Sequence, residues 1–304
     1  MNPKAIVTIP PYAPFIDDVL QHPAVSGIRL NTVMPVKKAD TLDDVIARLQ
    51  MKAERYRKDL YVDLKCRQLR VKSFGVPPFT EIELTHAIEV HTPVKAYFSA
   101  GEEVATVLEV DGNRLIMQEG PKRVVGPGES VNILHSSLRI LGYLTETDQA
   151  YIAACRKNKL HNYMLSFVEG KQDREALLKL DPEANIVEKI ESTKGLRYVR
   201  EEYDRKARLM LARGDLFIEV EKPHEILQAS EDVLKKDHDA IAASRIFPSL
   251  AFSLNPSCAD INDLDNLLRT GYKTVMLGDE VCQHADSVMS SLNLFYEIAK
   301  RYGK

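Results

Sequence analysis

The sequence predicts an α/β fold, a (β/α)8 TIM barrel with a small all-β domain inserted after the third strand. Short apolar runs alternate with amphipathic stretches, a pattern typical of a parallel sheet that is covered by helices on both faces. There are eight such runs, which is the strand number of a closed barrel. An open doubly wound sheet is the alternative, but no GxGxxG turn follows the first run.

The barrel elements follow one another along most of the chain. Residues 42–49 carry apolar side chains at helical spacing, and Thr145 begins a further helix in a sequence that resembles a capping box. A last helix is predicted from His284 to Arg301, with one apolar stripe that would pack on the barrel. The predicted barrel strands are residues 5–9, 27–30, 60–64, 163–167, 185–190, 208–212, 239–243 and 274–277.

The alternation breaks after the third strand. Asp111-Gly112 is a typical hairpin turn within this stretch. We therefore predict an inserted β-rich domain over residues 71–133 and a barrel made of residues 1–70 and 134–304. The insertion would stand at the barrel mouth, as a lid that excludes water or as a decoration without a chemical role. Its predicted strands are residues 81–84, 88–91, 94–98, 104–110 and 114–117.

The composition narrows the class of protein. The chain has 304 residues and a net charge of -3, and no basic stripe is interleaved with aromatic residues, so we expect no nucleic-acid partner. No run of eighteen apolar residues is present, so we expect no membrane span or signal peptide. The four cysteines share no CxxC spacing, which favours a reduced, cytoplasmic protein.

Charged residues end two neighbouring predicted strands. Lys189 and Glu191 are two residues apart, so their side chains point to one side. Asp215 follows the next strand and can supply a second carboxylate. Two hard oxygen ligands beside a fixed ammonium suit a divalent metal that holds an anionic substrate. The sequence therefore predicts an enzyme.

Further polar residues follow the other strands, and barrel strands converge on one mouth. Each alone has an ordinary explanation, such as a helix cap or a salt bridge at the rim. Their convergence on one face favours a site. These residues are Arg29, Asn31, Asp63, Lys65, Ser166, Arg213, Ser244 and Arg245.

The chain resembles the catalytic barrel of pyruvate kinase. Glu188-Lys189-Ile190-Glu191-Ser192 resembles the KIEN strand of that family, and Leu211-Ala212-Arg213-Gly214-Asp215-Leu216 resembles its ARGDL loop. The matches keep the order of the family, and the β-rich insertion falls where the family has its mobile lid. Further matches are residues 27–31 with ARLNFSHG, 63–70 with DTKGPEIR, 130–133 with KGVNLPG, 165–168 with ASFVR and 275–277 with MLSGET.

The resemblance implies a role for each matching residue. Lys189 would stabilise charge on the phosphoryl group or the enolate, and Glu191 and Asp215 would hold Mg2+ or Mn2+. Ser244 would lie near the enolate carbon, and Arg29 would contact phosphate and take part in catalysis. Substrate would be bound by Ala212, Arg213, Gly214, Asp215 and Ser166. We expect Arg245, which does not match the family, to bind substrate as well. Nucleotide or phosphate would be bound by Arg29, Asn31, Lys65, Arg70 and Asn132, and a monovalent cation by Asn31 and Asp63.

Several positions depart from the family pattern. Val33 stands where the family has serine and cannot coordinate a cation, so binding of K+ is doubtful. Gln68 replaces a glutamate, and Arg245 adds a cation at the mouth. Asp279 begins a rebuilt segment after the last strand.

Three functions agree with these residues. The first is metal-dependent phosphoryl transfer between a nucleotide (ADP or ATP) and a phosphoenolpyruvate-like or 2-oxo acid substrate. The second is a nucleotide-independent aldolase or decarboxylase that acts on a 2-oxo acid, and the third is a non-catalytic regulatory relative. We also expect a single barrel without the family's carboxyl-terminal regulatory domain. A homodimer could form through late barrel helices that carry Leu264, Leu267 and Leu268.

Overall fold

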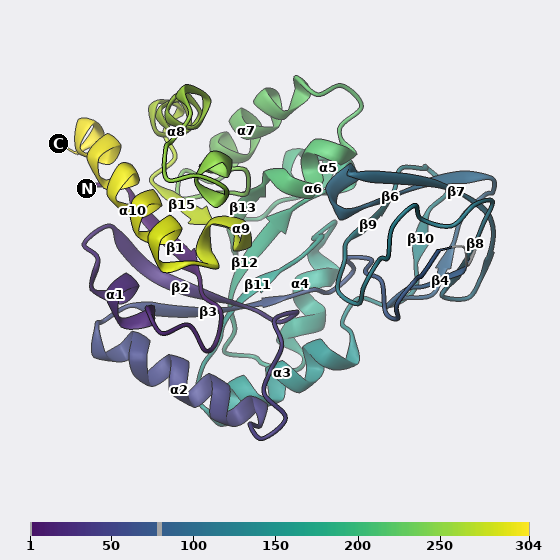
Figure 1. Ribbon diagram of the computed structural model, residues 1–304, viewed down its shortest axis with the longest axis horizontal. Coiled ribbons are helices and arrows are strands. Elements are labelled where there is room, and N and C mark those ends of the chain that lie inside the picture. Colours follow the sequence, from purple (N-terminus) through teal and green to yellow (C-terminus); the bar gives the residue numbers. More distant parts are fainter. Residues whose placement is uncertain (1, 78–80, 304) are drawn as a thin grey trace.

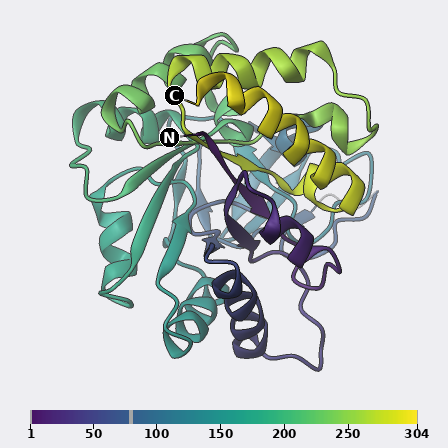
Figure 2. The same ribbon diagram turned by 90° about the vertical axis from the view of Figure 1, so that its left-hand side faces the viewer.

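The computed structural model describes residues 2–77 and 81–303 (Figure 1). Residues 1, 78–80 and 304, which belong to the predicted barrel and insertion ranges, lie outside the described residues. Both chain ends lie next to each other on one side of the barrel, and a β-rich unit projects from the opposite side (Figure 1 and Figure 2).

Eight parallel strands of the described chain close into a barrel, which confirms the predicted fold class. Their order is β1-β15-β14-β13-β12-β11-β3-β2, and β2 pairs again with β1. The strands are β1 (Lys4–Thr8), β2 (Val25–Asn31), β3 (Asp59–Leu64), β11 (Asn162–Leu165), β12 (Asn185–Ile190), β13 (Arg208–Ala212), β14 (Ile241–Ala243) and β15 (Thr274–Leu277).

Two predicted barrel strands are longer than the observed ones, and so are the predicted strands 81–84 and 88–91 of the insertion, which end at Glu83 and Glu89. Strand β11 ends at Leu165, and Phe167 has a left-handed φ of 50° that does not continue a strand. Strand β14 begins only at Ile241, because the side chain of Asp237 accepts the backbone N–H of Asp239 at 3.0 Å and holds a turn before it.

Helices surround the barrel (Figure 2). Side chains of Thr41, Thr145 and Ser257 begin α2, α3 and α8 as capping boxes, and the Thr145 box is the predicted one. The helices are α1 (Ile16–Gln21), α2 (Leu42–Arg55), α3 (Glu146–Lys157), α4 (Lys171–Leu178), α5 (Thr193–Glu201), α6 (Arg213–Glu219), α7 (Glu225–Lys236), α8 (Cys258–Thr270), α9 (Asp279–Cys282) and α10 (Ala285–Ala299). Short 3-10 turns are η1 (Ser99–Gly101), η2 (Pro248–Ala251) and η3 (Lys300–Tyr302).

Alternation along the strands separates an inner core from an outer one. On β13, Met210 belongs to the cluster inside the barrel, whereas Leu209 and Leu211 belong to the cluster beneath the helices. The apolar stripe of α10, which includes Leu292 and Phe295, is buried in the outer cluster as predicted.

The leucines proposed for a dimer contact are not available for one. Leu264, Leu267 and Leu268 on α8 are at most 5% exposed and pack in the outer core of their own barrel. In the described ranges, no helix has both the length and the apolar character needed to cross a membrane.

The insertion after β3 is β-rich, as predicted. It forms a five-stranded sheet in the order β4-β8-β7-β6-β9 with its own core, which includes Phe98, Val107 and Leu115. Gly112, with φ of 61°, lies in the predicted turn between β7 and β8. The domain limits at residues 71 and 133 stay a prediction. Strand β10 lies beyond residue 133, yet it pairs with β5 inside the insertion. The strands are β4 (Glu81–Glu83), β5 (Ile88–Glu89), β6 (Val94–Phe98), β7 (Glu103–Asp111), β8 (Arg114–Met117), β9 (Val131–Ile133) and β10 (Arg139–Ile140).

Candidate active site

Strand β12 places Lys189 inside the barrel. Val187 belongs to the inner cluster, whereas Ile186 and Ile190 pack beneath the helices, so Lys189 faces the interior. Glu191 directly follows the strand and points to the same side. The two-residue spacing thus brings Lys189 Nζ to 3.1 Å from Glu191 Oε1.

Three oxygen-bearing groups hold the ammonium of Lys189. Besides its contact with Glu191, Nζ donates to Ser166 Oγ at 2.9 Å and to Asp63 Oδ1 at 3.2 Å. Although burial favours the neutral amine, the carboxylates of Asp63 and Glu191 raise the pKa of Lys189. A charged ammonium is therefore fixed at the barrel mouth, where it can stabilise negative charge on a bound molecule.

Glu191 and Asp215 are the candidate ligands of a divalent cation. Glu191 Oε2 accepts the backbone N–H of Phe167 at 2.8 Å, and Asp215 Oδ2 accepts an N–H of Gln68 at 2.9 Å. Burial raises the pKa of Glu191, and the charge of Asp215 adds to that shift. Asp215 Oδ1 is buried and has no hydrogen-bond partner among the described residues.

These oxygens fit Mg2+ or Mn2+. Two carboxylates near each other repel until a cation lies between them, and Mg2+ in proteins is often held by one or two carboxylates together with substrate and water. Within the described chain, no three or more His, Cys, Asp or Glu side chains gather into a metal cluster. A cation at Glu191 and Asp215 would therefore take its other ligands from substrate or water.

The surroundings of Asp63 do not suit binding of the expected monovalent cation. Its Oδ2 accepts from Lys65 Nζ at 2.7 Å and from Arg29 Nε at 2.9 Å, and its Oδ1 accepts from Lys189. Burial alone would raise the pKa of Asp63, but the charges of these three side chains hold it well below its usual range. K+ would compete with the side chains of Arg29, Lys65 and Lys189 for one carboxylate, although burial lowers the pKa of Lys65 to about 7.

Asp279, which follows β15, holds Arg29 and Asn31 of β2, two strands further along the barrel wall. Its carboxylate accepts from Asn31 Nδ2 at 3.0 Å and from Arg29 Nη1 at 3.2 Å, and Arg29 Nη1 also donates to Thr8 Oγ1 at 2.9 Å. The amide nitrogen of Asn31 is thereby engaged with an acid instead of a phosphate. The guanidinium of Arg29 is preorganised between Asp63 and Asp279.

The end of β14 is strained. Ser244, Arg245 and Phe247 have φ values of 66°, 55° and 57°, and each left-handed residue of this kind costs about 1–3 kcal/mol. The strained turn places the guanidinium carbon of Arg245 4.3 Å from the ring centre of Phe217. Burial and the charge of Arg213 lower the pKa of Arg245. Backbone strain of this size is typical of functional sites.

The mouth encloses a cavity of about 760 Å³. The predicted residues that line it are Arg29, Asn31, Lys65, Arg70, Lys189, Glu191, Gly214, Asp215, Ser244 and Arg245. Its ionisable lining, in the described chain, consists of five cations and five carboxylates. The cations are Arg29, Lys65, Arg70, Lys189 and Arg245, and the carboxylates are Glu102, Glu191, Asp215, Asp279 and Glu280.

The remaining predicted residues lie outside this lining. Asp63 and Ser166 are buried against Lys189, and Ala212 is buried at the end of β13. The guanidinium of Arg213 turns to Asp263 on α8, with Nη1 2.7 Å from Oδ1. Asn132 lies on β9 of the insertion, where its Nδ2 donates to Glu219 Oε1 at 3.4 Å.

Sequence reasoning gave no role to two residues of the site, Gln68 and Asp279. Gln68 Nε2 holds Asp215, and its Oε1 accepts from Arg70 Nε at 3.0 Å. Both residues were visible only as departures from a family pattern. The position of Asp279 directly after the last barrel strand is the signal that could have identified it.

Comparison with known proteins identifies the family of the chain. The chain is a (β/α)8-barrel protein with a β-rich insertion after β3 and with a lysine and two carboxylates at the barrel mouth. The family model described as "Pyruvate kinase, barrel domain" matches residues 79–287. The chain belongs to the pyruvate kinase family.

Curated relatives are similar at low identity. A pyruvate kinase of Naumovozyma castellii is 30% identical over 210 residues, which cover 64% of this chain and 42% of the relative. A pyruvate kinase of Borreliella burgdorferi is 24% identical over 224 residues, which cover 71% of this chain and 46% of the relative. The chain thus spans less than half the length of these relatives.

Proposed function

We propose that the chain catalyses metal-dependent phosphoryl transfer on a phosphoenolpyruvate-like or 2-oxo acid substrate, with ADP or ATP as partner. The observation that carries the proposal is the ammonium of Lys189, fixed among Asp63, Ser166 and Glu191. Asp215 lines the same cavity, and its Oδ1 has no hydrogen-bond partner among the described residues. Membership of the pyruvate kinase family and the names of the relatives support it.

Lys189 would act on the charge that develops during the reaction. Its ammonium cannot swing away, because three neighbouring groups hold it. A fixed charge needs little reorganisation when negative charge grows on a transferred phosphoryl oxygen or on an enolate oxygen. Arg29, preorganised between two aspartates, would add a second cation toward the phosphoryl group.

Glu191 and Asp215 would hold Mg2+ or Mn2+. When bound, the metal would act as a Lewis acid that polarises substrate oxygens. Gln68 would keep Asp215 Oδ1 turned to the cavity by holding the other oxygen. The first turn of α6 at Gly214 would offer backbone N–H groups, which have no partner within a helix, to a substrate carboxylate.

A coupled assay of pyruvate formation from phosphoenolpyruvate and ADP, with and without Mg2+, tests the proposal. We expect turnover only with the metal and its loss in Lys189→Met. Lys273→Met is the matched control, because this lysine is exposed and pairs only loosely with Asp239 at 3.8 Å. Absence of turnover in a wild-type protein that binds oxalate and Mg2+ would reject this chemistry.

One observation favours a second function, a nucleotide-independent aldolase or decarboxylase on a 2-oxo acid. Asn31, expected to bind nucleotide or phosphate, is engaged by Asp279, while the cation of Arg245 lines the cavity. Such a mouth suits a substrate with a second carboxylate. Release of pyruvate from oxaloacetate without any nucleotide, lost in Glu191→Gln, would support this function over phosphoryl transfer.

A further inference from the structure

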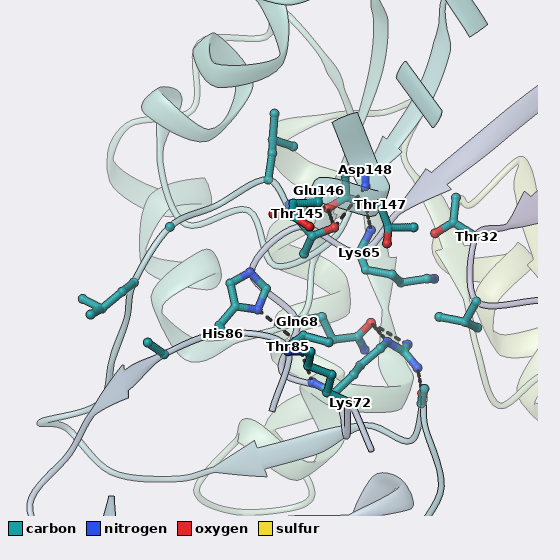
Figure 3. Close-up of a pocket in the computed structure, with 17 residues that line it drawn as sticks. Thr32, Lys65, Gln68, Lys72, Thr85, His86, Thr145, Glu146, Thr147 and Asp148 are labelled. Carbon is teal, nitrogen blue, oxygen red and sulfur yellow. Dashed lines mark hydrogen bonds between the residues drawn. The ribbon is translucent and has the colours of Figure 1, made fainter. Parts of the chain in front are cut away.

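The insertion contacts the barrel unevenly. At the beginning of α3, a cavity of about 520 Å³ lies between the two, with Thr85 and His86 on one side and Thr145 and Glu146 on the other (Figure 3). At α6, by contrast, η1 and β9 of the insertion pack on the helix (Figure 1). The insertion also has its own apolar core, apart from the two clusters of the barrel. Contacts at α6 are therefore suited to hold one unit against the other.

Helix α6 connects the barrel mouth to the insertion. Its first turn carries Asp215, and Ile218 near its end lies close to η1. Gly101 of η1 has a φ of 90°, and a Cβ there would lie only 3.1 Å from Ile218 Cδ1. Ser99, Gly101 and Glu102 of this segment also line the cavity of the mouth. The fit of the insertion on α6 thus shapes one wall of the proposed site.

A polar pair between β9 and α6 is only half satisfied. Asn132 Nδ2 donates to Glu219 Oε1 at 3.4 Å, which is long for a hydrogen bond. Asn132 is 3% exposed, and its Oδ1 is buried without a hydrogen-bond partner in the described part of the chain. An ionised carboxylate only accepts hydrogen bonds, whereas a protonated carboxyl group has one O–H to donate. Protonation of Glu219 would therefore let the acid and the amide bond to each other in both directions.

The surroundings of Glu219 favour its protonated form near neutral pH. Burial is the main cause that raises the pKa of Glu219 from 4.5 to about 7, and the hydrogen bond from Asn132 opposes the shift. The charges of Asp215 and Glu169 add to the shift, and the charge of Lys194 on α5 opposes it. Most of these groups are fixed in the fold, so the carboxyl group changes its charge within the physiological range of pH.

The other elements packed on α6 also bring charged groups to this region. Glu102 follows η1 and is exposed, Arg245 follows β14, and Glu225 begins α7. A cation bound at Asp215 would remove only a smaller part of the pKa shift of Glu219, since burial is its main cause. We therefore expect Glu219 to titrate near neutral pH whether or not a metal is bound.

We propose that Glu219, in its protonated form, holds the insertion on α6 through a two-way hydrogen bond with Asn132. Below neutral pH, the carboxyl group accepts from Nδ2 and donates to Oδ1, so the insertion stays on the helix. Above neutral pH, the carboxylate leaves Oδ1 unsatisfied, and separation of the two surfaces is favoured because water can then reach this oxygen. The inference concerns how the insertion sits on the barrel and does not depend on the proposed reaction. Glu219 is in this sense a positioning residue.

Double electron–electron resonance between two spin labels measures this separation in the whole chain. One label is attached to Cys258, an exposed native cysteine, and the other to the side chain introduced by Glu109→Cys on the surface of β7. We expect the fraction of molecules with a separated insertion to rise about fivefold from pH 6 to pH 8, as the loss of one hydrogen bond implies. Glu219→Gln should abolish this rise, because its amide can accept from Nδ2 and donate to Oδ1 at either pH.

Two further variants complete the test. Asn132→Ala should give, at both pH values, the larger separated fraction that the wild type has at pH 8. Glu221→Gln is the matched control, because Glu221 is exposed just beyond α6, and it should keep the response to pH. A wild-type distance distribution that is the same at pH 6 and pH 8 would overturn the proposal. A response that persists in Glu219→Gln, or is lost in Glu221→Gln, would also overturn it, since another group would then be responsible.

Discussion

Gln68 offers the sharpest test of the proposed divalent site. Its side-chain amide donates to Asp215 Oδ2 at 2.9 Å and accepts from Arg70 Nε at 3.0 Å. Replacement by leucine keeps the volume nearly constant and removes both contacts. Gln68 is 4% exposed, so water cannot easily take over its role.

The size of the expected loss in Mn2+ affinity follows from one hydrogen bond to a charged acceptor. Such bonds contribute about 1.5–3 kcal/mol, and about 1.4 kcal/mol corresponds to a tenfold change in affinity. Loss of the donor frees Asp215 Oδ2 to contact the metal, which by itself would favour binding. The freed carboxylate, however, can turn away, and loss of such an outer partner typically lowers metal affinity by 10–100-fold. We therefore expect Gln68→Leu to weaken Mn2+ binding at least tenfold.

Calorimetric titration with Mn2+ measures this change. Gln21→Leu on the surface of α1 is the matched control, and the melting temperature shows whether Gln68→Leu remains folded. Mn2+ affinity within twofold of the wild type in a folded Gln68→Leu protein would refute the role given to Asp215 and its partner.

Three further predictions follow from the charges of the protein. Replacing Na+ by K+ should leave pyruvate formation unchanged, because Asp63 is already neutralised; a several-fold activation by K+ would contradict this. Arg245→Met should raise KM for the anionic substrate about tenfold through loss of one charge-assisted contact, with the melting temperature unchanged. An unaltered KM would place Arg245 outside the substrate site. Burial raises the pKa of Glu188 from 4.5 to about 7, so its contribution to stability is complete below pH 4.5 and is lost as the pH rises through 7. Urea unfolding should show a loss of about 3 kcal/mol across that range, and Glu188→Gln should remove it.

Residues on regular strands were the predictable part of the site. Strand alternation placed Lys189 and Glu191 on one side, because the two-residue period is a property of the backbone. The eight apolar runs likewise indicated a parallel sheet, and their number favoured the barrel over an open doubly wound sheet.

Contacts between elements that are far apart in the sequence were not predictable in this way. Asp279 reaches Arg29 across 250 positions of sequence, and no local pattern encodes such a contact. The side chain of Arg213 turned to Asp263 because a partner on α8 was available. Leu264 could have faced outward or inward from its helix, and only the packed barrel decides between the two.

The equal number of positive and negative side chains around the mouth has a consequence for how ligands arrive. An electrically balanced entrance exerts little pull on a lone anion or a lone dication. Binding of either the anion or the dication leaves the cavity with an uncompensated charge that attracts the other. Metal and substrate should therefore each increase the affinity for the other. The ligand that the protein binds best would then be a preformed complex of metal and substrate.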